Sequence, residues 1–376
     1  MKIIFVQNIM TPYRISFFNS YHGVDENFKV YYMAKSEEGR SWKIDTDKIK
    51  YSYKVYDGFQ KRFGSYHLHF NIKMLKDICS SPSILILGGS WNDINIIIIS
   101  ILKRLGILRK HKVFFWTEAN MLTLGSLKTN FLKKSIRKFV LGSSDGNFIV
   151  PGAMAIKTLK HWEIPIANII YLPNVIEEEK FFPAPERQIN FNSGNCNGLA
   201  NVILPARLIE KYKGIKNFFD SIGIDNIKRA RFHILGDGDD FDLYERYIKN
   251  NHLGANIILH GFCNEKLSEF YSKADFFLLP SFSDQSPLVI VEACYNGLPL
   301  LISNRCGNHF ETLEEEINGF SFDPYDNKSI KIAFEKMMDR RKDWREMGKN
   351  SRKKYDDFFD KNTATQRFYK QLQDLN

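Results

Sequence analysis

The sequence predicts an α/β protein with two doubly wound domains, and three observations support this prediction. The chain has 376 residues, which suggests two domains at about 150 residues each. Short runs of Ile, Val, Leu and Phe recur, each followed by a polar loop and an amphipathic stretch. Such runs are typical of parallel strands covered by helices on both faces. The pattern pauses once, at 183–200, and then restarts.

Each apolar run marks an expected strand. In the first half these runs are Lys2–Gln7, Phe28–Met33, Ser83–Leu87, Lys112–Trp116 and Gly146–Val150. In the second half they are Asn201–Ala206, Arg231–Gly236, Asn256–His260, Phe276–Leu279 and Leu298–Ser303. Residues 183–200 are rich in Pro, Asn and Gly, which predicts a linker. From about Ile330 to Leu375 the pattern is helical and dense in charge, and we expect solvated helices that cover the sheet.

The amino-acid composition limits the class of protein to which this chain can belong. Hydrophobic residues make up 44% and charged residues 26% of the chain, which is ordinary for a globular protein. Five scattered cysteines without CxxC spacing favour reduced thiols over a disulfide framework or a zinc site. The longest apolar run, 94–102, is far shorter than the roughly 20 residues that span a bilayer. The first residues read as a strand rather than a signal peptide, so we expect a cytoplasmic location.

The positive charge is concentrated in the first half. Residues 1–180 hold 26 basic and 15 acidic side chains, whereas 181–376 hold 27 and 28. This excess attracts an anionic partner. Residues 127–141 have the spacing of a basic amphipathic helix, with Phe131, Leu132, Ser135, Ile136, Phe139 and Val140 on one side. Such a helix either packs on its own sheet or docks on an anionic membrane surface.

Ligand-capable groups follow several strands of the second half. Arg207 ends one strand and Lys213 follows six residues later, so two cations could hold a diphosphate. Gly236 and Gly238 follow the next strand, and glycine lets a backbone pass close to a ligand. The pair Gly261-Phe262 comes after another strand and fits either ligand approach or a plain turn.

The most specific segment is 279–300. Asp284 stands in a loop, and Glu292 lies eight positions later inside an apolar helix start. A carboxylate placed there needs polar partners, because burying it alone is costly. Backbone amides at Ser286 and Leu288 lie near the start of that helix, where an anion is favoured. Glu292 could then bind sugar hydroxyls, although an exposed surface glutamate is the plainer interpretation.

Together these segments resemble the retaining family-4 glycosyltransferases of group 1, which have the GT-B architecture of two Rossmann-like domains facing a central cleft. The resemblance covers most of 199–325 and is fainter in the first half, where 11–14 and 171–175 are similar to family segments. It implies an N-terminal acceptor domain over 1–180 and a nucleotide-sugar donor domain over 181–355. A C-terminal helix within 356–376 would cross back to the first domain.

The resemblance also implies roles for single residues. Arg207 and Lys213 would bind the donor diphosphate, Asp284 the transferred sugar and Glu292 the nucleotide ribose. The backbone of Ser286, Leu288 and Val289 would meet the phosphate, and Gly236, Gly238, Gly261 and Phe262 would line the donor site. Pro12, Tyr13 and Arg14 would meet a carbohydrate or lipid-linked acceptor. Neither a metal ion nor a cofactor would be required, because cations and amides stabilise the leaving diphosphate.

This sequence departs from the family pattern in several places. Asp284 stands where Glu is usual, Pro287 has no N–H to donate, and Gly307-Asn308 replaces a Gly-Gly pair. The histidine often found after a middle strand is absent, and Glu118 is the residue we consider in its place as a catalytic group.

The resemblance therefore implies a retaining transferase that moves a sugar from a nucleoside diphosphate to an acceptor hydroxyl. Surface polysaccharide or glycolipid biosynthesis is the expected setting, with the protein peripheral on the inner face of the membrane. A soluble glucan- or sucrose-type enzyme and a non-catalytic nucleotide-sugar-binding subunit remain as alternatives. A dinucleotide-dependent oxidoreductase is disfavoured because Phe241 occupies the place of the third glycine. The sequence contains no motif typical of a nucleic-acid-binding domain.

Overall fold

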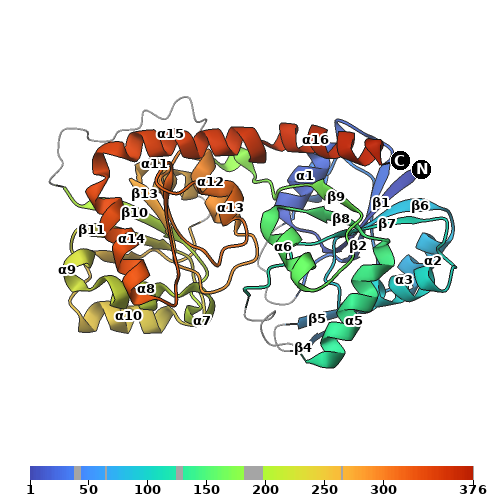
Figure 1. Ribbon diagram of the computed structural model, residues 1–376, viewed down its shortest axis with the longest axis horizontal. Coiled ribbons are helices and arrows are strands. Elements are labelled where there is room, and N and C mark those ends of the chain that lie inside the picture. Colours follow the sequence, from blue (N-terminus) through green and yellow to red (C-terminus); the bar gives the residue numbers. More distant parts are fainter. Residues whose placement is uncertain (38–43, 64–65, 124–129, 182–197, 264–265, 376) are drawn as a thin grey trace. The chain divides into compact units, whose positions relative to one another are not determined.

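The computed structural model describes residues 1–37, 44–63, 66–123, 130–181, 198–263 and 266–375. Its contacts divide the chain into two units (Figure 1). Unit 1 contains the described residues of 1–121, 130–175 and 361–375, and unit 2 contains 122–123 and those of 176–360. The linker expected at 183–200 falls largely outside the described residues. Each unit is described by itself.

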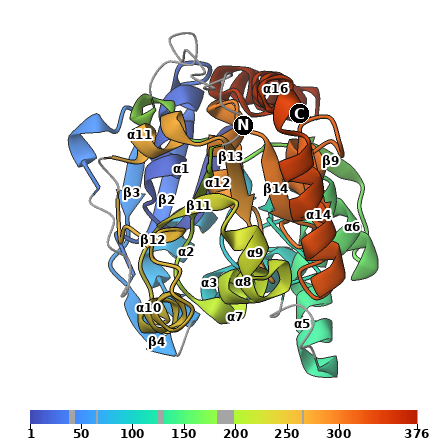
Figure 2. The same ribbon diagram turned by 90° about the vertical axis from the view of Figure 1, so that its left-hand side faces the viewer.

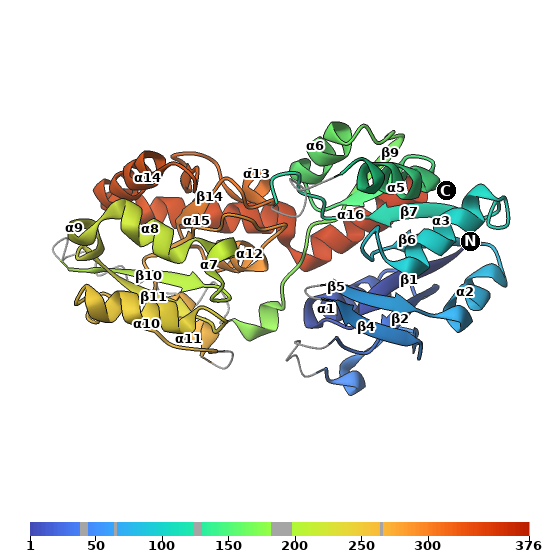
Figure 3. The same ribbon diagram turned by 90° about the horizontal axis from the view of Figure 1, so that it is seen from below.

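Unit 1 is built on a parallel sheet with the strand order β3-β2-β1-β6-β7-β8-β9. Its strands are β1 (Lys2–Ile9), β2 (Phe28–Ala34), β3 (Tyr53–Val55), β6 (Ser83–Leu87), β7 (Lys112–Trp116), β8 (Asn147–Val150) and β9 (Asn168–Tyr171). Its α-helices are α1 (Pro12–His22), α2 (Ile72–Cys79), α3 (Ile94–Arg104), α5 (Phe131–Leu141), α6 (Ala153–His161) and α16 (Lys361–Asp374). A separate antiparallel hairpin is formed by β4 (Phe59–Phe63) and β5 (Tyr66–Phe70). Figure 3 shows β1, β6 and β7 side by side.

Successive side chains of β1 point to opposite faces of this sheet, and helices cover both faces. Phe5 belongs to an aromatic core that α1 and α16 complete, with Phe18 and Phe368 among its members. Ile4 and Val6 point to the opposite face and join the core formed with α2, α3, α5 and α6. Successive residues of a strand face opposite sides, so a continuous apolar run fills both cores.

Unit 2 repeats this plan with the strand order β12-β11-β10-β13-β14-β15. Its strands are β10 (Ala200–Pro205), β11 (Ala230–Leu235), β12 (Ile257–Leu259), β13 (Phe276–Leu279), β14 (Leu300–Ser303) and β15 (Gly319–Phe322). Its α-helices are α7 (Glu210–Lys213), α8 (Ile215–Ile222), α9 (Ile224–Ile227), α10 (Phe241–Asn250), α11 (Leu267–Lys273), α12 (Leu288–Tyr295), α13 (His309–Thr312), α14 (Asn327–Asp339) and α15 (Trp344–Lys354). Figure 2 shows α8, α10, α11 and α14 around the sheet. The expected α/β fold with two doubly wound units is thus confirmed.

The last helix returns to the first unit. A π-helical segment, Tyr355–Phe359, lies at the C-terminal end of unit 2. The next helix, α16, packs along α1 of unit 1 (Figure 1). Ala364, Phe368 and Leu372 of α16 are fully buried in the core that contains Phe5. The polypeptide therefore passes from unit 1 to unit 2 and back again.

Candidate functional site

The loops after β10 and β13, neighbouring strands of unit 2, bring Lys213 and Asp284 together. Lys213 is the last residue of α7, and its Nζ lies 2.5 Å from Oδ2 of Asp284. Gly214 ends α7 with a φ of 60°, a left-handed conformation that favours glycine, and α8 starts at the next residue. Arg207 follows β10 and its side chain is exposed. The structure thus places both predicted cations at the carboxyl edge of the sheet, where ligands bind in open α/β folds.

The N-terminus of α12 lies at the same edge. Leu288 and Val289 are its first two residues, so their N–H groups have no partner within the helix. Asn308 fixes the approach to the helix by donating its side-chain amide to the carbonyl of Pro287 at 3.0 Å. Gly307 donates its N–H to the carbonyl of Asp284 at 3.2 Å. Asn308 is buried and was not among the predicted site residues; only its place in the Gly-Gly position of the family pointed to it.

Glu292 lies on α12 with its carboxylate half-buried beside Tyr271. The Tyr271 hydroxyl donates to Oε2 of Glu292 at 2.9 Å. Burial raises the pKa of Glu292 to about 7, while the Tyr271 hydrogen bond and the charge of Lys180 act in the lowering direction. Glu292 is therefore not the plain surface glutamate of the alternative interpretation. Tyr271 on α11 is a partner that the sequence did not predict.

The predicted glycines of unit 2 fall into two kinds. A Cβ on Gly236 would lie 2.0 Å from the carbonyl oxygen of Ala206, and one on Gly238 would lie 2.4 Å from that of Leu208. Both glycines thus permit the loops after β10 and β11 to pack together, which is a structural reason independent of any ligand. Gly261, with a φ of 67°, faces open space. Phe262 beside it is 74% exposed, an unusual exposure for so large an apolar side chain.

In unit 1 the structure brings Arg14 and Glu118 together. Arg14, near the start of α1, donates to Oε1 of Glu118 at 2.8 Å, and its guanidinium carbon lies 3.6 Å from the ring centroid of Trp116. Glu118 follows β7, so this pair sits at the carboxyl edge of the unit 1 sheet. Burial raises the pKa of Tyr13, its neighbour on α1 after Pro12. Three of the four predicted unit 1 residues therefore form one cluster.

The basic amphipathic helix is α5, and it packs by a different face from the one expected to be apolar. Residues 127–129 of the predicted helix lie outside the described residues. The buried residues of α5 are Arg137, Val140 and Leu141, and the Arg137 guanidinium lies 3.7 Å from the ring centroid of Trp162. Phe131 and Leu132 are 85% and 65% exposed. Most of the predicted apolar side is thus not used to pack α5 on its sheet.

Within the described residues, no group of three or more His, Cys, Asp and Glu side chains could hold a metal ion.

Sequence comparison gives a family match that lies within unit 2 and matches to two named transferases. Residues 186–354 match the family described as glycosyl transferases group 1. Over 189 residues, 47% of this chain, the sequence is 29% identical to alpha-galactosylglucosyldiacylglycerol synthase of Streptococcus pneumoniae, of which the match covers 50%. Over 213 residues, 52% of this chain, it is 28% identical to UDP-Gal:alpha-D-GlcNAc-diphosphoundecaprenol alpha-1,3-galactosyltransferase of Escherichia coli, of which the match covers 51%. The chain thus spans about half the length of the curated relatives it matches.

Structural comparison covers both units. The chain matches the crystal structure of Anabaena Alr3699/HepE in complex with UDP with a TM-score of 0.74, over 100% of both chains. At 13% identity this likeness concerns the fold. The expected GT-B type of fold is confirmed by it.

Proposed function

Because residues 186–354 belong to the group 1 glycosyl transferases, we propose that the chain transfers a sugar from a nucleoside diphosphate to an acceptor hydroxyl with retention at the anomeric carbon. Glycolipid or surface polysaccharide biosynthesis is the proposed setting, since relatives are named a glycolipid synthase and a galactosyltransferase acting on a lipid diphosphate. The observation that carries the proposal is the placement of Arg207, Lys213, Asp284 and the N-terminus of α12 at one sheet edge.

This edge suits a departing diphosphate. In the transfer, the bond between the anomeric carbon and a diphosphate oxygen breaks, and the acceptor oxygen forms the new bond to that carbon. The electron pair leaves with the diphosphate, so negative charge grows there, and a diphosphate oxygen can take the proton that the acceptor hydroxyl loses. Lys213 and Arg207, with the N–H groups of Leu288 and Val289, can stabilise this charge without a metal ion. Each such donor is typically worth about 3 kcal/mol in the transition state.

Asp284 and Glu292 would hold the donor in place. Asp284 is paired with Lys213, so a diphosphate bound to Lys213 would bring its sugar beside Asp284. Glu292 accepts a hydrogen bond from Tyr271 and can accept further bonds from ribose hydroxyls. Phe262 is exposed shortly after β12, and its ring face is available to stack on the nucleobase. The acceptor would meet unit 1 at Pro12, Tyr13 and Arg14, with Glu118 as the carboxylate nearest to Arg14.

A thermal-shift series tests the donor site. UDP, GDP, ADP and CMP, with and without attached sugars, are added to the wild type and to Arg207→Ala and Glu292→Ala. A hundredfold excess over Kd adds about 2.7 kcal/mol to the free energy of unfolding. We expect one nucleotide to stabilise the wild type and both variants to lose this response. If no nucleotide shifts the wild type at millimolar concentration, the proposal of a donor site is wrong.

We also propose that the protein docks on an anionic membrane through unit 1. Among the described residues, no helix is long and apolar enough to cross a bilayer. The docking surface, called the α3–α5 surface, contains the exposed apolar residues Ile101, Leu105, Ile107, Phe131, Leu132, Ile136 and Phe139 and the exposed cations Arg104, Arg109, Lys110, Lys134 and Lys138. Arg104 joins the two helices, because it donates to the carbonyl of Phe139 at 3.0 Å. Exposed apolar side chains accompanied by exposed cations are typical of interfacial binding.

Vesicle binding tests the α3–α5 surface. The double variant Phe131→Ser with Leu132→Ser should reduce partitioning into vesicles of anionic phospholipid by about tenfold or more, because two exposed apolar side chains are lost. Binding should also weaken with salt, since each cation contributes about 1 kcal/mol near the surface. Ile332→Ser on α14 removes an exposed apolar side chain of unit 2 and serves as the control. Equal binding of the wild type and the double variant would show that this proposal is wrong.

A further inference from the structure

Tyr271 of α11 is a fully buried residue whose hydroxyl lies between two parts of α12. This hydroxyl is 2.9 Å from Oε2 of Glu292 and 3.2 Å from the carbonyl oxygen of Val289. Val289 belongs to the first turn of α12, whose N–H groups are the proposed ligands of the diphosphate. One hydroxyl group thus joins the phosphate end of α12 to the carboxylate that is proposed to hold the ribose.

The ring of Tyr271 is held in place by the connector, residues 176–181, which is the first stretch of unit 2 after β9. Phe181 of the connector is buried and meets Tyr271 edge-on, with ring centroids 5.5 Å apart and ring planes at 89°. The Phe181 ring also lies 5.8 Å from the ring of Tyr295 on α12. Aromatic pairs prefer particular relative orientations. The Tyr271 ring, and with it the direction of its hydroxyl, is therefore fixed by packing.

The connector is anchored in turn to the π-helical segment at the end of unit 2. The Tyr355 hydroxyl donates to Oε1 of Glu178 in the connector. The Tyr355 ring packs edge-on against Tyr295, with centroids 4.9 Å apart. Tyr271, Phe181, Tyr295 and Tyr355 thus form a continuous row of ring contacts. Replacing Tyr271 by Phe would keep all four rings and remove only the hydroxyl that reaches Glu292.

Among the described residues, the groups that act on the Glu292 carboxyl come from α11 and the connector. Burial is the largest influence and raises the pKa of Glu292 to about 7. The Tyr271 hydrogen bond and the charge of Lys180 lower this pKa, and the charge of Glu177 raises it. Lys180 and Glu177 also pair with each other at 2.7 Å. Near neutral pH, both forms of the Glu292 carboxyl are therefore populated, and Tyr271 favours the ionised one.

The ionised form of Glu292 is the better ligand for ribose hydroxyls. A carboxylate accepts hydrogen bonds at both oxygens, whereas a protonated carboxyl uses one of them as a donor. Hydrogen bonds to an ionised acceptor are also about twice as strong as those between neutral groups. A hydroxyl that donates to Oε2 stabilises this form and leaves Oε1 able to accept from a ligand.

We propose that Tyr271 is a positioning residue of the donor site, whose hydroxyl keeps the Glu292 carboxylate ionised and in one orientation, so that binding of a ribose releases the proton of Glu292. The identity of the ligand as a nucleotide rests on the proposed function. The Glu292 proton goes to solvent, the Tyr271 hydroxyl keeps its own, and the ribose hydroxyls donate to the carboxylate. Affinity should therefore rise with pH as Glu292 ionises and level off above that range. Tyr271 is fully buried and touches no substrate.

The first measurement needs no ligand. The side-chain carboxyl carbon of Glu292 is followed by carbon-13 NMR during a pH titration of the wild type and of Tyr271→Phe, and its signal is assigned by its absence from Glu292→Gln. The midpoint should lie near 7 in the wild type. In Tyr271→Phe it should lie higher by about 1 pH unit or more, because a hydrogen bond to the charged form is lost. An unmoved midpoint would overturn the proposal.

Tyr56→Phe is the matched control for this titration. Tyr56 is also buried, and its hydroxyl donates to a carboxylate, Oδ2 of Asp77, at 2.6 Å in unit 1. Loss of this bond should leave the midpoint of Glu292 as in the wild type. An equal shift in both variants would trace the effect to a general loosening of the protein, and the positioning role would be wrong.

The second measurement uses ribose hydroxyls as the probe. UDP, GDP and ADP, each with its 2′-deoxy and 3′-deoxy counterparts, are titrated by calorimetry into the wild type and Tyr271→Phe. The wild type should bind one ribonucleotide about tenfold or more tightly than a deoxy counterpart, since a hydrogen bond to a charged group is lost. In Tyr271→Phe this preference should fall to about threefold or less near neutral pH and recover at higher pH, where Glu292 ionises without help. An unchanged preference at neutral pH would contradict the positioning role.

Glu292→Gln measures the part of the pH dependence that belongs to the ligand. A phosphate group titrates near pH 6 by itself, so some change of affinity with pH is expected for any diphosphate site. This part should remain in Glu292→Gln, whereas the rise contributed by Glu292 should disappear. If the wild type and Glu292→Gln show the same pH profile, Glu292 releases no proton on binding and the proposal is wrong.

These outcomes separate this proposal from the proposed function. If a nucleotide binds, but its ribose preference and the Glu292 midpoint are the same in the wild type and Tyr271→Phe, the donor site stands and the positioning role falls. If no nucleotide binds the wild type, the donor site is wrong. In that case a midpoint that rises in Tyr271→Phe would still support Tyr271 as the residue that orients the Glu292 carboxylate.

Discussion

Each unit has a pair of glycines directly after its parallel strands, and the two pairs have different structural roles. In unit 2, Gly236 and Gly238 lie against the backbone carbonyls of Ala206 and Leu208. In unit 1, Gly88 and Gly89 lie against the side-chain amides of Gln7 and Asn8. Backbone carbonyls of packed loops cannot move aside, whereas a side-chain amide can. The first pair is therefore fixed by backbone, whereas the second is packed against side chains that can adjust.

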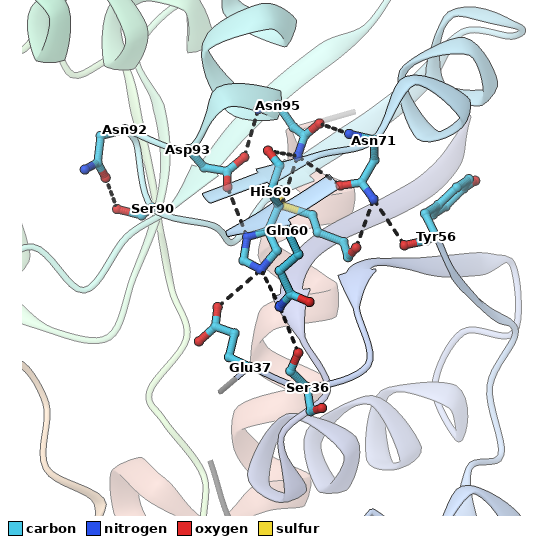
Figure 4. A network of polar contacts seen from close by, with 11 residues as sticks. Ser36, Glu37, Tyr56, Gln60, His69, Asn71, Ser90, Asn92, Asp93 and Asn95 are labelled. Atoms are coloured by element: carbon cyan, nitrogen blue, oxygen red, sulfur yellow. Dashed lines mark hydrogen bonds and ion pairs between the residues drawn. The ribbon is translucent and has the colours of Figure 1, made fainter. Parts of the chain in front are cut away.

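The same contrast holds for the charged groups. Unit 2 keeps its carboxylate-cation pair, Asp284 with Lys213, at the sheet edge where the proposed diphosphate would bind. Unit 1 buries a charge cluster in which His69 of β5 lies 3.3 Å from Asp93 and 3.5 Å from Glu37 (Figure 4). Substitutions at Lys213 or Asp284 should therefore act directly on chemistry, and those in the His69 cluster on packing and stability.

The largest expected effect is on turnover. Lys213→Ala should lower turnover by about two orders of magnitude or more, because the growing charge on the diphosphate loses about 3 kcal/mol of stabilisation. Steady-state rates with a donor identified by thermal shift measure this. Lys211→Ala, two residues earlier on α7 and exposed, should keep nearly the wild-type rate. Near-normal turnover in Lys213→Ala would contradict the assignment.

At Gly236 of unit 2, we expect an effect on stability that is comparable in free energy to the effect of Lys213→Ala on turnover. Gly236→Ala should lower the free energy of unfolding by about 3 kcal/mol, because its φ of 150° is strained for alanine and its Cβ would meet a backbone oxygen. Gly261→Ala, where the Cβ meets open space, should lose only about 1 kcal/mol. Urea unfolding of both variants provides the measurement. Equal losses would mean that the contact with Ala206 does not matter.

An intermediate effect of opposite sign is expected at Glu292. Its pKa of about 7 lies above the ordinary value of 4.5, so ionising this group costs free energy only in the folded protein. Its contribution to stability is therefore full below about pH 4 and is lost as the pH rises through 7. Glu292→Gln should raise the free energy of unfolding by about 2 kcal/mol near pH 8 and leave it unchanged near pH 4.

This gain in stability should accompany a loss of function. If Glu292 holds the ribose, the stabilised Glu292→Gln variant should respond less to nucleotide than the wild type. Urea unfolding at the two pH values, with and without nucleotide, checks both statements. A difference in stability that does not depend on pH would show that the carboxylate does not titrate as described.

The smallest expected change in stability is at Gly88. Gly88→Ala should cost less than about 1 kcal/mol, because the new methyl group meets the movable end of Gln7 rather than backbone. A loss as large as that of Gly236→Ala would erase the contrast between the two glycine pairs.

Much of the fold could be predicted from the sequence because the buried strands are continuous apolar runs. Ser83–Leu87, Lys112–Trp116 and Phe276–Leu279 begin and end as expected. The hairpin β4–β5 was missed, since polar and charged residues interrupt its pattern. β15 was missed because a run of four residues, one of them Ser321, is too short to stand out.

The candidate site divides in the same way. Asp284 and Glu292 lie within one segment, and Arg207 with Lys213 in another, so their spacing together with the family resemblance could point to them. Glu37, His69 and Asp93 come from three distant segments, and only the fold brings them together. Tyr271 was missed for the same reason, because it reaches Glu292 from another helix.

The return of α16 to unit 1 has a consequence for biosynthesis. Phe368 and Leu372, which fill the aromatic core around Phe5, leave the ribosome after all of unit 2. Unit 2 is complete in sequence at Asp360, before that core can close. We therefore expect unit 2 to fold first during translation, because one face of the unit 1 sheet is only partly covered, by α1, until α16 has been made. A stalled nascent chain that ends at Asp360 should protect unit 2 from protease and leave unit 1 open to cleavage.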